Sequence, residues 1–525
     1  MGNSDKEGPQ ARLGHHAKAK TYGPWSGHPE PVGLDPEPRL STQHAWTRPG
    51  TTRHSPCPLE KHGPRSLKRG RPSRGEEEDG RGIRELECLN NLCGHLRIHN
   101  MERVRDASHV RKAKLMEKGK VYQLEMVWKV RNADEGTNMT DYSEVVEALE
   151  LPPNLIELSI NGFPDVKLPW TTVLEISPFW VENSTTTLNS FPFLEELIVE
   201  ECSILRIAPS DFPAVKEITL NCVGKEGVSS LLSQPWSVTS LEKLRIKNCP
   251  ELSLTLTSTF SSLKEIYIFN IGGLDMICSS ANNDHHDAPS YFLALEKLRI
   301  KNCPELSLTL SSTFPSLKEI YIYEIHDLDV MCSSANNDPR RHHLPSLTSI
   351  HVERVPEFTD LPKGFLQSSS SEHLQSVSIW VCDKFLGFVD VEGPELPLLF
   401  SSNLKQIKLL CCGNLESINV RGLTSLETLE ITYCSWRGLE SSIIGLQSLQ
   451  ALKKLTLYSV PIIMLSGEDA ISDGCCWPHL EILNILGSRN VTLTASHLPS
   501  LKVMQIDCTD IEPITNDDIL LPSLT

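Results

Sequence analysis

Several features that are common in globular proteins are scarce or missing in this chain. Aromatic residues make up only 6% of its 525 residues, so Leu and Ile must supply most of any core. There is no run of about 18 apolar residues that would predict a membrane-spanning helix. The first ten residues, MGNSDKEGPQ, lack the apolar segment of a secretory signal. We therefore expect neither a secretory leader nor a transmembrane helix.

The common catalytic and cofactor motifs are also missing. The sequence contains no G-x-x-x-x-G-K-[ST], H-E-x-x-H, C-x-x-C, G-x-S-x-G or G-x-G-x-x-G pattern. Two histidine clusters, 285–287 and 342–343, could contact a metal ion, but each lies in an expected loop without a fixed third ligand. We therefore expect no enzyme, no cofactor and no metal site.

Negative charge predominates, with a formal net charge of −17, but it is unevenly distributed. Residues 1–84 hold 15 lysines and arginines against 10 aspartates and glutamates, so the excess negative charge lies in the remainder. Contacts with nucleic-acid phosphates require clustered cations. The acidic remainder therefore argues against general nucleic-acid binding.

A 44-residue stretch of the chain occurs twice. The segment 241–284, LEKLRIKNCPELSLTLTSTFSSLKEIYIFNIGGLDMICSSANND, returns 54 residues later with eight changes. Each copy holds two units of the form L-x-x-L-x-L-x-x-C, where the last slot is cysteine or another apolar residue. This spacing is typical of leucine-rich repeats, in which alternate apolar residues form one buried strand face. One unit cannot bury that face alone, so it must stack on neighbours.

The same pattern predicts the fold class of residues 83–525. We expect an α/β leucine-rich-repeat solenoid of about sixteen irregular repeats, curved like a horseshoe, with parallel strands on its concave face. Near its start the sequence predicts a helix over 107–118 between two strands, and a short helix before the strand at Leu155. The chain ends on Leu521-Pro-Ser-Leu524-Thr525 without a polar capping repeat, so we expect a truncated array.

The cysteines follow the repeats. Sixteen cysteines could indicate a disulfide scaffold, but six occupy the last slot of a repeat: Cys202, Cys249, Cys303, Cys382, Cys412 and Cys434. Stacked slots of this kind hold buried, reduced thiols. A cytoplasmic location, possibly also nuclear, fits reduced cysteines best.

Sequence details beyond the repeats resemble one family. A helix-strand block from Ile83 ends in Trp128, a Pro-Asn-Leu repeat follows at 153–155, and Pro169-Trp170 comes next. Leu-Pro-Ser-Leu introduces strands at 344–347 and 498–501. This run resembles the leucine-rich-repeat region of plant nucleotide-binding disease-resistance proteins, especially the coiled-coil type of grasses. The nucleotide-binding switch of that family is absent here, so ATP binding and cell-death signalling are not expected of this chain.

Residues 1–82 differ from the rest. They are rich in Pro, Gly, His and Arg and have no apolar period, so we expect a disordered basic tail. Arg69-Gly70-Arg71-Pro72 matches the core of an AT-hook, which places arginines in an A·T-rich minor groove. An incidental basic cluster or part of a nuclear-localisation patch explains these residues as well.

The exposed positions of the strands supply the candidate binding site. In L-x-x-L-x-L the x residues point away from the core, and neighbouring repeats place basic and aromatic side chains there in alternation. The candidates are Arg245, Lys247, Tyr267, Phe269, Arg299, Lys301, Tyr321, Tyr323, His351, Glu353 and Trp380. Tyr, Trp and Arg dominate protein interfaces, although ordinary lateral pairing between strands would also use such residues.

The resemblance and the concave face together predict a non-catalytic recognition module of plant innate immunity. Its partner would be a pathogen effector, a host protein or the nucleotide-binding domain of a related receptor, with no membrane partner. Two alternatives remain open. One is a nuclear DNA-associated protein acting through 69–72, and the other is a non-functional truncated resistance-gene product.

Overall fold

The computed structural model describes most of the repeat array. The described residues are 81–129, 143–168, 191–207, 212–234, 239–257, 260–277, 292–310, 314–330, 344–359, 361, 373–387, 403–416, 418–420, 422–438, 443–460, 477–488 and 498–508. All belong to one compact unit, Ser66–Thr525. The unit Met1–Arg65, the AT-hook-like residues 69–72, Pro169-Trp170, both histidine clusters and the chain end lie outside the described residues.

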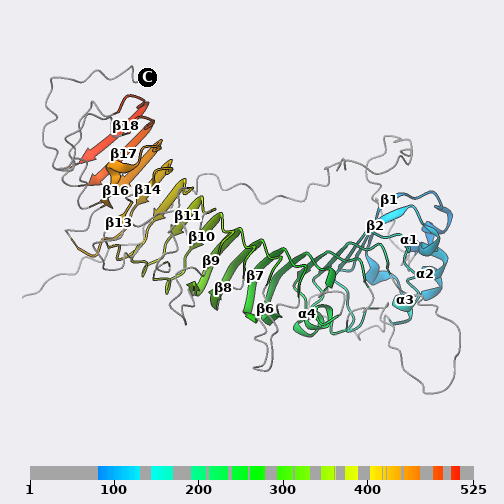
Figure 1. Ribbon diagram of the computed structural model, residues 1–525. Coiled ribbons are helices and arrows are strands. Elements are labelled where there is room, and N and C mark those ends of the chain that lie inside the picture. Colours follow the sequence, from blue (N-terminus) through cyan, green and yellow to red (C-terminus); the bar gives the residue numbers. More distant parts are fainter. Residues whose placement is uncertain are drawn as a thin grey trace, which may run out of the picture. The chain divides into compact units, whose positions relative to one another are not determined.

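One parallel sheet of 16 strands organises this unit (Figure 1). Each strand pairs with the next strand in sequence order, and the sheet stays open at both ends. Its strands are β1 Gly94–His99, β2 Val121–Val127, β3 Glu157–Asn161, β4 Glu196–Glu200, β5 Glu217–Asn221, β6 Lys243–Thr257, β7 Glu265–Ile277, β8 Lys297–Leu310, β9 Glu319–Val330, β10 Ser349–Glu353, β11 Ser376–Trp380, β12 Gln406–Leu410, β14 Thr428–Thr432, β16 Lys454–Tyr458, β17 Ile482–Ser488 and β18 Val503–Cys508. The predicted α/β repeat fold with parallel strands is confirmed.

Helices and a second small sheet complete the unit. They are α1 Arg81–Arg84, η1 Glu85–Cys88, η2 Met101–Arg103, α2 Ala107–Ala113, η3 Leu115–Glu117, α3 Ser143–Glu147, α4 Lys225–Leu232, η4 Leu446–Ser448, β13 Ile418–Asn419 and β15 Ile443–Ile444. None of the helices in these described ranges is both long and apolar enough to cross a membrane. The prediction of one helix over 107–118 is wrong in its end. Lys114 adopts φ 49° and closes α2, and the 3-10 turn η3 follows.

The repeat register explains the core. We number each repeat from its first leucine, so that Leu241 is position 1 and Cys249 is position 9. Leu241, Leu244 and Ile246, at positions 1, 4 and 6, have no exposed surface. The same positions pair from strand to strand, as Leu244 with Ile266 and Ile246 with Ile268. Apolar side chains therefore stack on one face of the sheet throughout the array.

The duplicated segment departs from the expected short strands. β6 to β9 run for 12 to 15 residues, because the chain stays extended beyond position 9 (Figure 1). After an irregularity, Ser253 to Thr257 pair with Gly273 to Ile277, and Ser307 to Leu310 pair with Asp327 to Val330. Alternating leucines in ELSLTL supply a second buried set there. This period-2 pattern, which is present in the sequence, is the local signal for the longer strands.

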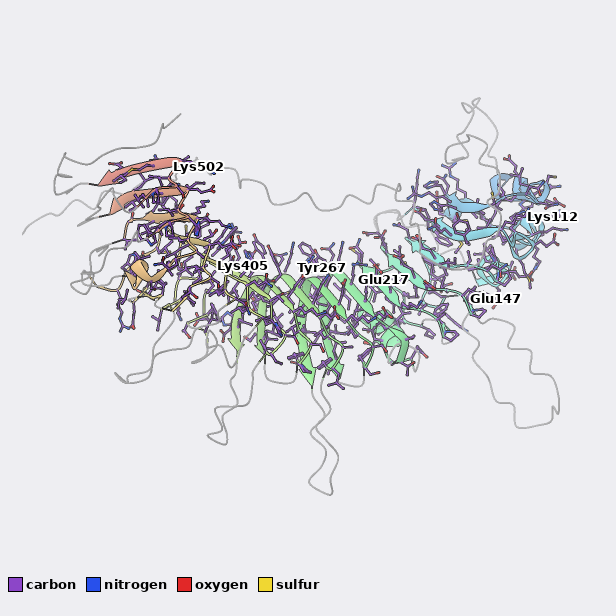
Figure 2. The ribbon with its side chains drawn as sticks, turned by 45° about the horizontal axis from the view of Figure 1, so that its top comes forward. Lys112, Glu147, Glu217, Tyr267, Lys405 and Lys502 are labelled. Carbon is purple, nitrogen blue, oxygen red and sulfur yellow. The ribbon has the colours of Figure 1, made fainter. Side chains whose placement is uncertain are left out.

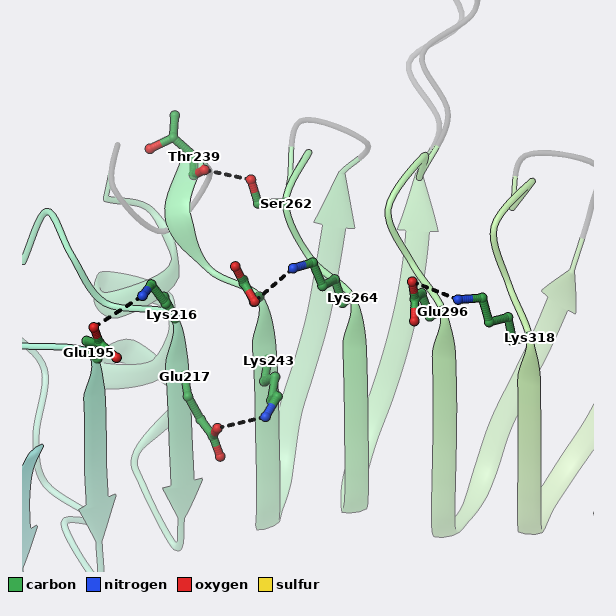
Figure 3. A network of polar contacts seen from close by, with 10 residues as sticks. Glu195, Lys216, Glu217, Thr239, Lys243, Ser262, Lys264, Glu296 and Lys318 are labelled. Carbon is green, nitrogen blue, oxygen red and sulfur yellow. Dashed lines mark hydrogen bonds and ion pairs between the residues drawn. The ribbon is translucent and has the colours of Figure 1, made fainter. Parts of the chain in front are cut away.

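Position 2 carries an alternating ladder of charges along the sheet. Glu195 binds Lys216 at 3.2 Å, Glu242 binds Lys264 at 2.9 Å, and Glu296 binds Lys318 at 3.0 Å (Figure 3). The pattern returns farther along, as Lys453–Glu427 at 2.7 Å and Lys502–Glu481 at 3.0 Å. Exposed pairs of this kind contribute only about 0–1 kcal/mol each. Their strict alternation instead favours the correct register, because a slipped repeat would place like charges together.

Position 8 lies in the left-handed region of the backbone in most repeats. Asn248, Asn270 and Asn302 adopt φ between 52° and 55°, which asparagine tolerates well. The same slot holds Val381 with φ 54° and Tyr433 with φ 54°. A β-branched residue is strained there, by about 1–2 kcal/mol. The Val381 N–H nevertheless donates to the Leu410 carbonyl at 2.7 Å, which continues the link between repeats.

Position 9 buries the thiols as the sequence predicted. All six cysteines of this slot are buried and free, and their Sγ atoms lie 3.0 to 3.6 Å from the position-7 carbonyl of their own repeat. Burial raises the pKa of Cys202 and of Cys382 to about 12. Cys202 and Cys382 are therefore protonated at neutral pH and serve as small apolar side chains that donate one weak hydrogen bond.

We predict that Val381→Asn stabilises the protein by about 1 kcal/mol, because asparagine adopts the left-handed conformation with less strain. Val381 is 38% exposed, so little apolar burial is lost. Urea unfolding followed by circular dichroism measures the change. The matched reverse variant, Asn302→Val, should lose a similar amount. No gain in the first variant would show that the φ 54° slot is not strained.

We also predict that Cys202 and Cys382 resist alkylation by iodoacetamide in the native protein at about pH 8.5, where a thiol of ordinary pKa is partly ionised. Cys88 and Cys93, which are exposed, are the internal controls and should react. Mass spectrometry of tryptic peptides gives each rate. In urea all four should react at similar rates. Native labelling of Cys202 as fast as that of Cys88 would contradict the buried slot.

Candidate functional site: the exposed strand face

Positions 3, 5 and 7 of the repeats point away from the core and form the exposed strand face. Tyr267 and Glu217 lie on this face in Figure 2, above strands of the central part of the sheet. Because the strands pair in register, each position forms a row that crosses the strands. Position 5 gives Arg245, Tyr267, Arg299, Tyr321 and His351. Position 7 gives Lys247, Phe269, Lys301, Tyr323, Glu353 and Trp380.

All eleven residues of the predicted concave-face site therefore come together on neighbouring strands, from β6 to β11. We call this surface the central patch. Basic strands alternate with aromatic strands in it, as the two kinds of repeat unit predicted. Most of its side chains are half-buried, because each packs against its neighbours in the row; Arg299 is exposed. The structure places these residues together, and their role in binding stays a prediction.

Cations and rings contact one another within the central patch. Lys247 Nζ lies 5.3 Å from the centre of the Tyr267 ring, and Lys301 Nζ lies 5.0 Å from that of Tyr321. These distances are typical of cation–π contacts. The duplication thus builds the same lysine–tyrosine pair twice. The pKa of the Tyr321 hydroxyl is raised, chiefly by burial and then by Glu353.

An aromatic stack extends the patch towards β11. The His351 ring lies parallel to Tyr321, with ring centres 4.6 Å apart, and meets Trp380 edge-on at 4.9 Å. His351 Nε2 is 3.3 Å from a carboxylate oxygen of Glu353. Three rings from three consecutive strands are thereby held in fixed orientations. Such rigid, half-exposed rings lose little entropy when a partner packs on them.

Position 3 adds charges that the sequence analysis did not select. Lys243 binds Glu217 at 3.4 Å (Figure 3), and Arg245 also contacts Glu217. Lys297 binds Glu265 at 3.3 Å. Farther along, Arg299 binds Glu319 at 3.2 Å. The arginines of position 5 are therefore largely neutralised by the neighbouring row, which only the pairing of strands reveals.

Arg354 is a second residue missed by sequence reasoning. It occupies position 8 of β10, one residue beyond the selected positions, and its guanidinium lies 5.4 Å from the Tyr323 ring centre. Its Nη1 also donates to the Tyr323 hydroxyl at 2.7 Å. The turn at φ 54° directs this side chain back over the neighbouring strand. The L-x-x-L-x-L pattern contains no signal for that reversal.

The face is acidic on the strands that precede the central patch. Position 3 holds three consecutive glutamates, Glu157, Glu196 and Glu217. Burial, followed by the Glu157 carboxylate, raises the pKa of Glu196. Burial also raises the pKa of Glu157, against His95 and the hydrogen bond from Gln123. Like charges stacked across the strands thus oppose ionisation.

After the central patch, position 7 is mostly apolar or aromatic. It continues from Trp380 through Leu410 of β12 and Thr432 of β14 to Tyr458 and Leu486. Tyr433, at the strained position 8, is 65% exposed and lies 5.2 Å from the Tyr458 ring. Position 5 stays charged there, since Lys408 binds Glu430 at 3.4 Å.

Comparisons with known proteins agree with this architecture. A family model described as R13L1/DRL21 LRRs matches residues 83–221. The disease resistance RPP13-like protein 1 of Arabidopsis thaliana is 24% identical over 390 residues, covering 72% of this chain and 29% of that protein. The disease resistance protein RGA2 of Solanum bulbocastanum is 27% identical over 243 residues, covering 46% and 21%. The chain spans less than a third of the length of these relatives.

Two solved structures are also similar to the chain. The TLR13–ssRNA13 complex gives a TM-score of 0.36 at 14% identity and covers 81% of this chain and 59% of that one. The functional domain of InlJ from Listeria monocytogenes gives a TM-score of 0.33 at 14% identity and covers 79% and 67%.

The repeat register and the family match define the chain as a leucine-rich-repeat protein. More particularly, its repeats are similar to those of the plant disease-resistance proteins named above. The resemblance noted in the sequence is thus confirmed. This relationship supports a role in plant immunity.

We predict that Glu196→Gln stabilises the protein at pH 7. A carboxyl whose folded pKa is raised destabilises the fold while it is ionised, and this penalty disappears as the pH falls through the raised pKa. The stability difference should therefore shrink towards about pH 4. Urea unfolding at several pH values measures it. The matched variant Glu195→Gln, which removes the ion pair with Lys216, should bring no gain at pH 7. Equal behaviour of the two variants would contradict the acidic row.

Proposed function

We propose that this chain is a non-catalytic recognition module of plant immunity that binds a protein partner through the central patch. The partner is a pathogen effector, a host protein or the nucleotide-binding domain of a related receptor. The observation that carries the proposal is the row arrangement itself. Cationic and aromatic strands alternate over β6 to β9, and a rigid ring stack adjoins them at β10 and β11.

The chemistry of this surface supports protein recognition over catalysis. Aromatic and cationic side chains that are half-buried and already oriented are the groups that carry most binding energy in protein interfaces. Within the described residues, no cluster of three or more His, Cys, Asp or Glu side chains could hold a metal ion. The proposal therefore assigns the patch to contact with a partner.

The compartment that we propose is the cytoplasm or the nucleus. Ten cysteines of the described part of the chain are free, and six of them stack in the same slot of the array. Free thiols in this number favour a reducing compartment. The partner must be present in the same compartment. A pathogen effector or the nucleotide-binding domain of a related receptor would therefore have to meet the chain there.

The test uses the full chain with a photo-crosslinking phenylalanine analogue at Tyr323, in the middle of the central patch. The matched control carries the same analogue at Gln505, on position 5 of β18, far along the same face. Both are expressed in plant tissue, and crosslinked proteins are identified by mass spectrometry. We expect a protein captured from position 323 and not from 505.

The captured protein is then purified and its affinity is measured. Tyr321→Ala and Trp380→Ala should each weaken binding at least about tenfold, which is the usual loss at an interface hot spot. Glu481→Ala, in the ion-pair ladder, is the control and should leave the affinity unchanged. Equal capture at both positions, or an affinity insensitive to Tyr321 and Trp380, would overturn the proposed surface.

A further inference from the structure

Two lysines in the central patch differ from the other cations on β6 and β8. On β6 and β8, the cations at positions 3 and 5 are ion-paired with glutamates on neighbouring strands: Lys243, Arg245, Lys297 and Arg299. Lys247 and Lys301, at position 7, instead lie over tyrosine rings. Among the described residues, neither ammonium forms an ion pair. Position 7 therefore presents two positive charges that no carboxylate in the described part of the chain neutralises.

The spacing of these lysines is fixed by the sheet. They stand on β6 and β8, with Phe269 of β7 between them in the same row. Neighbouring strands lie about 4.8 Å apart, so two spacings give about 9.6 Å between the backbones that carry the two charges. The row continues with Tyr323 on β9. Along position 7, cations and aromatic rings thus alternate at a regular interval from β6 to β9.

A polyproline-II segment has the matching period. It has three residues per turn and rises about 3.1 Å per residue, so every third side chain returns to the same face after about 9.3 Å. An extended β-strand also covers about 10 Å in three residues, but it turns the third side chain to the opposite face. An α-helix returns to one face after seven residues, at about 10.5 Å. The polyproline-II period fits the row most closely.

We propose that the central patch binds an acidic polyproline-II segment of a protein partner, with a carboxylate at every third residue. Two carboxylates contact Lys247 and Lys301, and the intervening proline or aliphatic residues pack on Phe269 and Tyr323. The segment runs across the strands along position 7. This inference rests on the proposed function and names the chemistry of its partner. Aromatic surfaces suit such segments, because a polyproline-II helix is already ordered before it binds.

The probe is a fluorescein-labelled peptide of four Glu-Pro-Pro triplets, titrated with the full chain and followed by fluorescence anisotropy at low and physiological salt. Two peptides serve as comparisons. One has the same composition, but its glutamates are grouped in adjacent pairs separated by four prolines, so that no two are three residues apart. The other is a proline-free, helix-forming peptide of the same net charge with glutamates seven residues apart. We expect the triplet peptide to bind at least about tenfold more tightly than either, since only it places two carboxylates about 9.3 Å apart on one face.

The decisive variant is Lys247→Gln with Lys301→Gln, which should weaken binding of the triplet peptide at least about tenfold. The matched control is Lys264→Gln with Lys318→Gln. These lysines are also 54 residues apart and remove the same charge, but they lie in the position-2 ladder and bind Glu242 and Glu296. The control should retain the affinity. Circular dichroism and urea unfolding establish that both double variants fold.

Several results would overturn the inference. Equal losses in the two double variants would mean that only net charge matters. Equal binding of the grouped or helical peptide would remove the period argument, and equal binding of a single-stranded oligonucleotide would indicate a general polyanion surface. The analogue at position 323 could capture a partner that the triplet peptide does not displace. In that case this inference fails while the proposed function stands. If position 323 captures nothing and the peptide does not bind, both fail.

Discussion

The parallel pairing of each strand with the next is the constraint on which the structure depends. A single repeat has three buried positions in or just before its strand, such as Leu241, Leu244 and Ile246. It has no further apolar layer of its own that would cover these side chains. The neighbouring repeats provide that cover, and the backbone bonds between strands hold them in place. Stability is therefore a sum of repeat-to-repeat contacts, and a fault at one junction affects its neighbours first.

The pairing register of the strands aligns equivalent positions of successive repeats into rows that cross the sheet. Because Leu244 pairs with Ile266, and Ile266 pairs with Leu298, the residues beside them are aligned as well. The position-2 ladder and the acidic row at position 3 are both products of this alignment. So is the repeated contact of a lysine with a tyrosine, since the duplicated segment copies one junction into another. The exposed strand face thus inherits its chemical pattern from the requirements of the core.

The same alignment allows local strain to be kept. Position 8 has a left-handed backbone in most repeats; in the duplicated segment asparagine fills it in three units and Glu324 in the fourth. Val381 and Tyr433 occupy the slot although their side chains suit it poorly, and both are exposed. Both lie next to aromatic residues of the exposed strand face, Val381 beside Trp380 in the chain and Tyr433 against the Tyr458 ring.

The sequence by itself determined the repeat unit, its strand direction, its buried positions and the buried thiols, because these follow from a local period and from the need of each unit to stack. It also determined which eleven side chains share the central patch, since the leucine spacing fixes the orientation of the residues between. It did not determine the end of α2, which depends on the left-handed backbone of Lys114. Nor did it determine the length of β6 to β9, which depends on a second set of strand pairs beyond position 9.

Only the tertiary structure decided the electrostatics of the site. The pattern shows Arg245 and Lys247 as equivalent cations, but strand pairing neutralises the first with Glu217 and places the second on Tyr267. Arg354 joins the patch through a turn that reverses its direction towards Tyr323. These contacts cross from one strand to another, and partners from different repeats are not encoded in any short stretch of residues. The physical reason is that charge depends on distance in space, whereas periodicity reports only neighbours along the chain.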